Sequence, residues 1–194
     1  MQAIFRDSTR CAIDVLRLAL LGVVLSQSLY PTVLCAAEQD SGQNPDVTWI
    51  VLRHAERDGD HDALSKAGQT RAEQLRQLGE VLNVTAVYTT NYERTKKTVE
   101  PLCKALGLTP ETYRQTSKEW FQDVRRRHAG GVVLIVGHSN TAGAIAGSLG
   151  GVAPFPIEHD EYDNLFIVQQ QQAAPCTIHL RYGARNAELA TPAN

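Results

Sequence analysis

Continuous apolar runs define the framework of the chain. Residues 47–52 (VTWIVL) and 131–137 (GVVLIVG) carry almost no polar side chains. Such runs are typical of strands that are buried on both faces of a parallel sheet, whereas half-exposed strands alternate apolar and polar residues. Shorter runs predict further strands at 86–90, 165–169 and 176–182.

The segments between these strands have apolar residues at helical spacing. Ser65 is a good first residue for a helix, and Ala72, Leu75, Leu78 and Leu82 follow it at helical spacing. Two further helices are predicted at 92–106 and 141–149. Strands that alternate with helices predict an α/β domain, a three-layer α/β/α sandwich with a mostly parallel central sheet.

The first 37 residues have a different pattern. Three arginines precede an uncharged apolar run, Leu18–Leu25, and the small residues Cys35 and Ala37 follow. This order predicts a signal peptide at 1–37 and a periplasmic or secreted protein that starts at Glu38, as the intact mass of native protein would show. The apolar run is far shorter than the roughly 20 residues of a membrane span. A retained N-terminal anchor or an unused start is the alternative.

The length of the remaining chain and the net charge limit the number of domains and the kinds of partner that we expect. Removing residues 1–37 leaves 157 residues, the size of one domain, which we place at 47–183. The small and polar segments at 38–46 and 184–194 are expected to be flexible. The net charge of the whole chain is −2, so we expect neither nucleic acid nor a membrane surface as a partner. The sequence leaves the oligomeric state open.

Two cysteines, Cys103 and Cys176, lie beyond the predicted leader. In an oxidising compartment they could form a disulfide. They could equally be free thiols, because the sequence does not give the distance between them. Both alternatives stay open at this point.

Polar side chains gather where the apolar strands end. Arg53 and His54 follow the first run, and His138 follows the run at 131–137. Arg94 lies at the start of the helix after strand 86–90, and a helix N-terminus attracts anions. Ligands of open α/β sheets bind outside the carboxyl ends of the strands. We therefore expect these four side chains to converge on one anion site.

Two arginines and two histidines suit phosphoryl transfer. Guanidinium groups bind phosphate oxygens in a bidentate way, and a neutral imidazole can act as a covalent nucleophile. Phosphoryl transfer needs such charge stabilisation and an in-line nucleophile. The sequence has no HExxH or CxxC pattern and no phosphate-binding GxxxxGK[ST] loop. We therefore expect neither a metal nor another cofactor.

Four motifs resemble those of the histidine phosphatase superfamily, the phosphoglycerate-mutase-like proteins. They are LRHAER, LSKAGQTRAEQL, VYTTNYERTKKTVEPL and VVLIVGHSNT, in the family's order. The resemblance implies a phosphoglycerate-mutase-like fold and a metal-independent phosphatase of the small exported branch. It makes His54 the phosphorylated nucleophile, with Arg53, Arg94 and His138 as the phosphate pocket. The expected substrate is a phosphorylated small molecule, sugar or envelope component.

The sequence also departs from the family pattern. Ala55 replaces the glycine of the mutases' Arg-His-Gly motif, and the chain is short, which favours a hydrolase over a mutase. In the family, a carboxylic acid between the second arginine and the second histidine protonates the leaving group. Glu119 and Asp123 lie in this interval, and Glu56 and Asp163 are further candidates for the acid. Without an acid, a good leaving group such as that of a phosphohistidine or acyl phosphate would be favoured.

Two other functions fit parts of the sequence. A non-catalytic binder of phosphorylated envelope components would use the same pocket without turnover. A serine hydrolase would use Ser139, because GHSNT differs from the G-x-S-x-G elbow only at Thr141. No HGGG-type segment for an oxyanion hole accompanies it.

Overall fold

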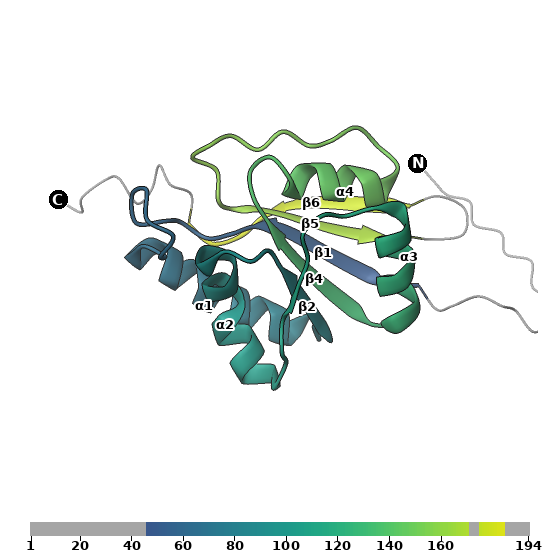
Figure 1. Cartoon of the computed structure of the whole chain (residues 1–194), viewed down its shortest axis with the longest axis horizontal. Helices are drawn as coiled ribbons and strands as arrows, with labels where there is room; N and C mark the ends of the chain where they lie inside the picture. Colours follow the sequence, from purple (N-terminus) through teal and green to yellow (C-terminus); the bar gives the residue numbers. More distant parts are fainter. Residues whose placement is uncertain (1–45, 171–174, 185–194) are drawn as a thin grey trace, which may run out of the picture. The chain divides into compact units, whose positions relative to one another are not determined.

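A computed structural model of the chain describes residues 46–170 and 175–184 (Figure 1). The predicted signal peptide at 1–37 lies outside the described residues. The segments 38–46 and 184–194 also lie outside them, except for Asp46 and Ala184.

One six-stranded sheet forms the centre of the described domain. Its strands follow the order β3-β2-β4-β1-β5-β6. Only β5 runs against the others, because it is antiparallel to both β1 and β6. The mostly parallel sheet predicted from the sequence is confirmed. The strands are β1 (Thr48–Arg53), β2 (Ala86–Thr89), β3 (Glu111–Thr112), β4 (Val132–Gly137), β5 (Asn164–Gln169) and β6 (Cys176–Arg181).

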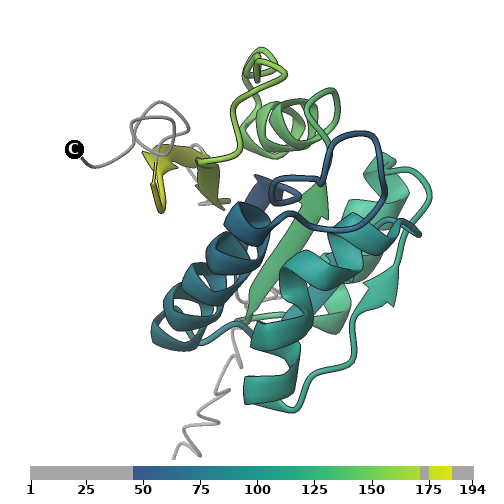
Figure 2. The ribbon, with the colours of Figure 1, turned by 90° about the vertical axis from the view of Figure 1, so that its left-hand side faces the viewer.

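Helices cover both faces of this sheet, as Figures 1 and 2 show. The helices are α1 (Lys66–Val81), α2 (Glu93–Leu106), α3 (Lys118–Arg127) and α4 (Ala142–Gly150). Helices α1 and α2 pack on one face, and α3 and α4 on the other. The α/β/α layers are therefore those expected, while α3 and the short strand β3 were not predicted.

The apolar run of β1 supplies both halves of the core. Trp49 and Val51 face the layer of α3 and α4, and Ile50 and Leu52 face the layer of α1 and α2. All four side chains are at most 2% exposed. A strand buried on both faces has a fixed position, so the residues that follow it are held by the core.

The starts of the two helices on the α1 side differ. The hydroxyl of Ser65 caps α1 by accepting a hydrogen bond from the Gly68 amide at 3.1 Å. Helix α2 follows Tyr92, whose side chain makes no capping hydrogen bond. The free amides at the start of α2 therefore need an acceptor from elsewhere in the domain.

Both cysteines are free thiols, so the disulfide alternative is wrong for this structure. Cys103 is a buried residue of α2, and burial raises its pKa to about 11. Cys176 is exposed at the start of the edge strand β6. The two residues thus belong to elements at different places in the fold.

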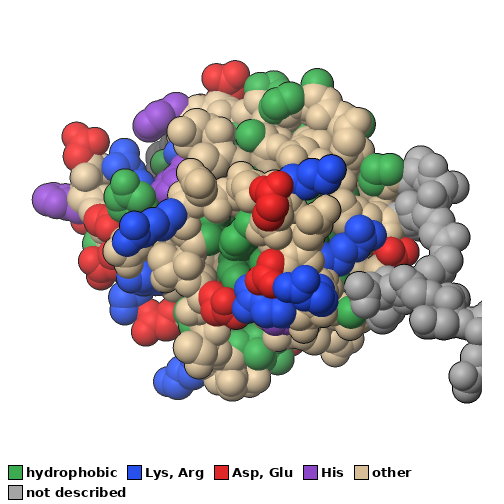
Figure 3. Space-filling model, turned by 45° about the vertical axis from the view of Figure 1, so that its right-hand side comes forward, with side chains coloured by type: hydrophobic (Ala, Val, Ile, Leu, Met, Phe, Trp, Pro, Cys, Tyr) green, Lys and Arg blue, Asp and Glu red, His purple; other side chains and the backbone are tan. Residues whose placement is uncertain are grey.

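Acidic and basic side chains lie beside one another on the face seen in Figure 3. Several belong to α3 and its neighbour β3, where Arg127 pairs with Asp123 and Glu111, each at 3.0 Å. Among the described residues, no helix is both long and apolar enough to cross a membrane.

Candidate active site

The structure brings the four predicted site residues together at the carboxyl ends of three strands. Arg53 ends β1 and His54 follows it, with the His54 amide donating to the Gly137 carbonyl at 2.9 Å. His138 follows β4, and Arg94 lies in the first turn of α2. Figure 2 views the domain from this end.

These side chains line one open pocket of about 330 Å³. The rings of His54 and His138 lie 5.4 Å apart, centroid to centroid. The lining residues are Arg53, His54, Arg57, Tyr92, Arg94, His138, Ser139, Asn140 and His159. The lining is cationic and contains no carboxylate, so it suits an anion.

His54 has the form that a nucleophile requires. Its Nδ1 lies 2.7 Å from the Ala55 carbonyl oxygen. A carbonyl can only accept, so Nδ1 carries the proton and Nε2 keeps its lone pair. Burial above all, together with the neighbouring Arg53, His138 and Arg94, lowers the pKa of His54 to about 3, although the Ala55 hydrogen bond opposes the shift. The ring is therefore neutral at pH 7.

His138 is held from both sides. Its Nδ1 faces Arg94 Nη2 at 3.4 Å, and its Nε2 lies 3.0 Å from the Thr90 hydroxyl. Because a guanidinium only donates, Nδ1 accepts and Nε2 carries the proton. Burial, followed by the charges of Arg94 and Arg53, lowers the pKa of His138 to about 4. Both histidines are therefore neutral near pH 7.

Arg53 ties the pocket to the loop before β5. Its Nη1 donates to the carbonyls of Glu158, His159 and Glu161 at 2.8–3.0 Å. The guanidinium also lies 3.9 Å above the Tyr162 ring. These contacts leave Nε buried without a hydrogen-bond partner.

Arg94 is fixed by neighbours on several sides. Its Nη1 pairs with Asp62 at 2.5 Å, and its guanidinium lies 4.1 Å from the Tyr92 ring centre. Like Arg53, it has a buried Nε without a partner. A buried donor without an acceptor is costly, and a phosphate oxygen that reached these N–H groups would remove that cost.

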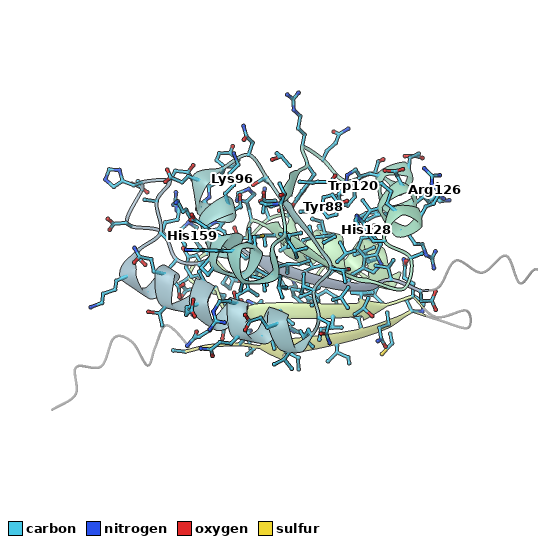
Figure 4. All side chains as sticks on the ribbon, turned by 90° about the horizontal axis from the view of Figure 1, so that it is seen from below. Tyr88, Lys96, Trp120, Arg126, His128 and His159 are labelled. Carbon is cyan, nitrogen blue, oxygen red and sulfur yellow. The ribbon has the colours of Figure 1, made fainter. Side chains whose placement is uncertain are left out.

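Several contributors to the pocket were not predicted. Arg57, Tyr92, Asn140 and His159 line it, and Figure 4 places His159 at this end of the sheet, away from Tyr88, Trp120 and His128. Tyr92 stands two positions before Arg94, which was a usable signal. The others lie on loops, whose course no periodicity predicts.

None of the four predicted acid candidates lines the pocket. Glu56 is buried and bonds Arg71, at 2.7–2.9 Å, and Asp163 pairs with Arg181 at 2.6 Å. Asp123 pairs with Arg126 and Arg127, and Glu119 belongs to the first turn of α3. These carboxylates therefore stabilise the fold or lie on its surface.

The geometry gives no support to Ser139 as a nucleophile. Ser139 does line the pocket. Both nitrogens of His138 and Nδ1 of His54 are engaged with other groups. In the part of the chain that the structure describes, no histidine bonds the Ser139 hydroxyl, although a serine hydrolase needs such a base.

Among residues 46–170 and 175–184, no group of three or more His, Cys, Asp or Glu side chains could hold a metal ion.

The depressed pKa values predict an acid-sensitive fold. Unfolded histidine titrates near 6.5, whereas His54 and His138 titrate near 3 and 4 in the folded protein. The unfolded chain therefore binds more protons below pH 6.5, so the unfolding free energy should fall as pH drops from 6.5 towards 4. Urea unfolding at several pH values and NMR titration of the imidazoles measure this. A His54 titration midpoint near 6.5 would contradict the account.

Comparisons with known proteins agree with this geometry. Residues 49–116 match the family model "Histidine phosphatase superfamily (branch 1)". This segment contains Arg53, His54 and Arg94. A search of curated proteins found no match.

Solved structures share the fold. SixA of Agrobacterium tumefaciens is 19% identical with a TM-score of 0.51, covering 72% of this chain and 100% of its own. A phosphoserine phosphatase of Entamoeba histolytica is 11% identical with a TM-score of 0.52, covering 68% and 94%. A mycobacterial glucosyl-3-phosphoglycerate phosphatase is 11% identical with a TM-score of 0.50, covering 71% and 98%.

Identities this low establish the fold alone, whereas the family model matches the segment that holds three of the four converging side chains. Together with the motif order in the sequence, these findings identify residues 49–116 as a histidine phosphatase superfamily segment and support a phosphatase.

Proposed function

We propose that the protein hydrolyses phosphomonoesters, or a phosphohistidine-type substrate, through a covalent phosphohistidine at His54, without a metal. The observation that carries the proposal is the state of His54. Its Nδ1 proton is held by Ala55, its pKa is far below neutrality, and its ring lines a pocket that also contains Arg53 and Arg94.

In the first step, the Nε2 lone pair of His54 attacks phosphorus as the bond to the leaving group breaks. Nδ1–H keeps its hydrogen bond to the Ala55 carbonyl, which stabilises the positive charge that develops on the ring. Arg53, Arg94 and His138 line the same pocket, in which the phosphoryl oxygens would lie. The N–H groups of the two arginines would stabilise the charge of the transition state.

In the second step, water attacks the phosphohistidine. The P–N bond breaks, inorganic phosphate leaves, and His54 regains its lone pair. The same cations serve both steps, because the phosphoryl group stays in place while the nucleophile and leaving group exchange roles.

The lining favours a substrate with a good leaving group. No carboxylate is among the pocket residues, so a strong general acid is lacking for a poor alkoxide leaving group. We therefore expect phosphohistidine, acyl and aryl phosphates to react faster than simple alkyl phosphates. The similar structures include SixA, assigned as a phosphohistidine phosphatase, and a phosphoserine phosphatase, so the fold accommodates both classes.

A phosphate-release assay with chelator tests this proposal. The panel contains an aryl phosphate, a phosphohistidine peptide, phosphoserine and phosphorylated sugars. We expect turnover, unchanged by chelator, with the first two substrates fastest. Binding without release would instead indicate the non-catalytic binder, and loss of activity in chelator would refute metal independence.

A further inference from the structure

The loop after β1 reaches across to the start of α2 through one side chain, Asp62. Its carboxylate accepts a hydrogen bond from the Glu93 amide at 2.7 Å. It also pairs with the Arg94 guanidinium at 2.5 Å and lies 3.5 Å from the Arg94 amide. One carboxylate thus contacts both the end of the helix and a side chain of the pocket.

Asp62 supplies the acceptor that α2 lacks. Tyr92 precedes the helix without a side-chain cap, so the amide of Glu93 depends on Asp62. A carboxylate at a helix N-terminus is stabilised by the amides and the helix dipole. Burial would raise the pKa of Asp62, but the Glu93 amide and Arg94 together lower it, so Asp62 stays charged.

The same contact fixes the orientation of Arg94. Nη1 is held by Asp62, and Nη2 faces His138 at 3.4 Å. The Tyr92 ring lies against the guanidinium. Of the two polar contacts, the one to Asp62 is the short, charge-assisted bond, and charged hydrogen bonds are the stronger ones. Without it, the guanidinium of Arg94 would keep only the ring contact to Tyr92 and the weak polar contact to His138.

The loop that carries Asp62 is itself anchored. The Asp58 amide donates to the Ala63 carbonyl at 3.1 Å, and Arg57 bridges to Leu64. The Ser65 amide donates to the Glu56 carbonyl at 3.0 Å, two residues beyond His54. His54 and Asp62 therefore belong to one loop that backbone hydrogen bonds hold in place.

We propose that Asp62 is a positioning residue that holds Arg94 in the geometry required for phosphoryl transfer. This inference rests on the proposed function. Asp62 does not line the pocket and stays charged, so it neither binds substrate nor supplies a proton. It acts through Arg94.

Asp62→Asn separates this role from helix capping. Asparagine caps helices as well as aspartate does, so thermal stability should stay close to that of the wild type. The amide lacks the charge that holds Arg94, so kcat for an aryl phosphate should fall about 10- to 100-fold, the size of effect expected for a catalytic group misplaced by about 1 Å. The inhibition constant for inorganic phosphate should rise by a smaller factor than kcat falls, because Arg53 still lines the pocket and a negative charge near it is removed. Asp58→Asn, with the same charge change on the same loop, should keep the wild-type kcat.

A double-mutant cycle tests the route of the effect. In an Arg94→Ala background, Asp62→Asn should cause no further loss of kcat, because its partner is already absent. A further loss of the same size would overturn the inference, since Asp62 would then act independently of Arg94. A wild-type kcat in Asp62→Asn, measured beside an inactive His54→Ala, would also overturn it and leave the proposed function standing.

Discussion

Replacing His54 with alanine is expected to abolish phosphatase activity, with kcat falling by on the order of 10³- to 10⁶-fold. The covalent route has no substitute nucleophile, because both nitrogens of His138 are engaged with Thr90 and Arg94. Phosphate binding should largely survive, since Arg53, Arg94 and His138 remain. Steady-state kinetics and phosphate binding by calorimetry measure the two effects separately.

Two further variants serve as controls for this test. His54→Asn retains a side-chain N–H for the Ala55 carbonyl, so it should fold like the wild type and still be inactive. His61→Ala, on the same loop but exposed, should keep full activity. Wild-type turnover in His54→Ala would refute the mechanism and make Ser139 the next candidate.

The largest expected loss of stability comes from Glu56→Gln. Glu56 is 8% and Arg71 2% exposed, and three donor–acceptor distances of 2.7–2.9 Å join them. Arg71 also donates to the carbonyls of Tyr182 and Ala184. Removing one charge leaves the other buried and uncompensated, so we expect the unfolding free energy to fall by about 3–5 kcal/mol. Urea unfolding at pH 7 measures it.

The exposed pair between Glu73 and Arg76 on α1 provides a matched control. Its atoms are 2.5 Å apart, but both side chains are at least 28% exposed. Glu73→Gln should therefore cost less than about 1 kcal/mol. If Glu56→Gln leaves the unfolding curve unchanged but lowers kcat, Glu56 takes part in the chemistry instead.

The sequence predicted those elements whose apolar pattern is strong. Strands β1 and β4 are continuous apolar runs, and their predicted ends agree with the structure to within a residue. Helix α3 was missed because it is rich in charge and buries only Val124 fully. Strand β3 was missed because it has only two residues, both exposed, and depends on pairing with β2.

The site residues also divide into those that the strand pattern predicts and those that it does not. His54 and His138 could be predicted because the core fixes where β1 and β4 end. Asp62, Tyr162 and His159 could not, because each lies on a loop whose course no periodicity in the sequence predicts. Arg53 was predicted as a phosphate ligand, but its three bonds to the loop before β5 depend on tertiary structure alone.

A phosphoryl group on His54 can be detected directly by trapping. Wild-type protein is mixed with an aryl phosphate and quenched in alkali, because acid would hydrolyse a phosphohistidine. The protein is then digested, and its peptides are analysed by mass spectrometry. We expect phosphate on the peptide that contains His54, and none on the corresponding peptide of His54→Ala. Phosphate on a peptide containing Ser139, or turnover with no phosphorylated peptide at any time point, would contradict it.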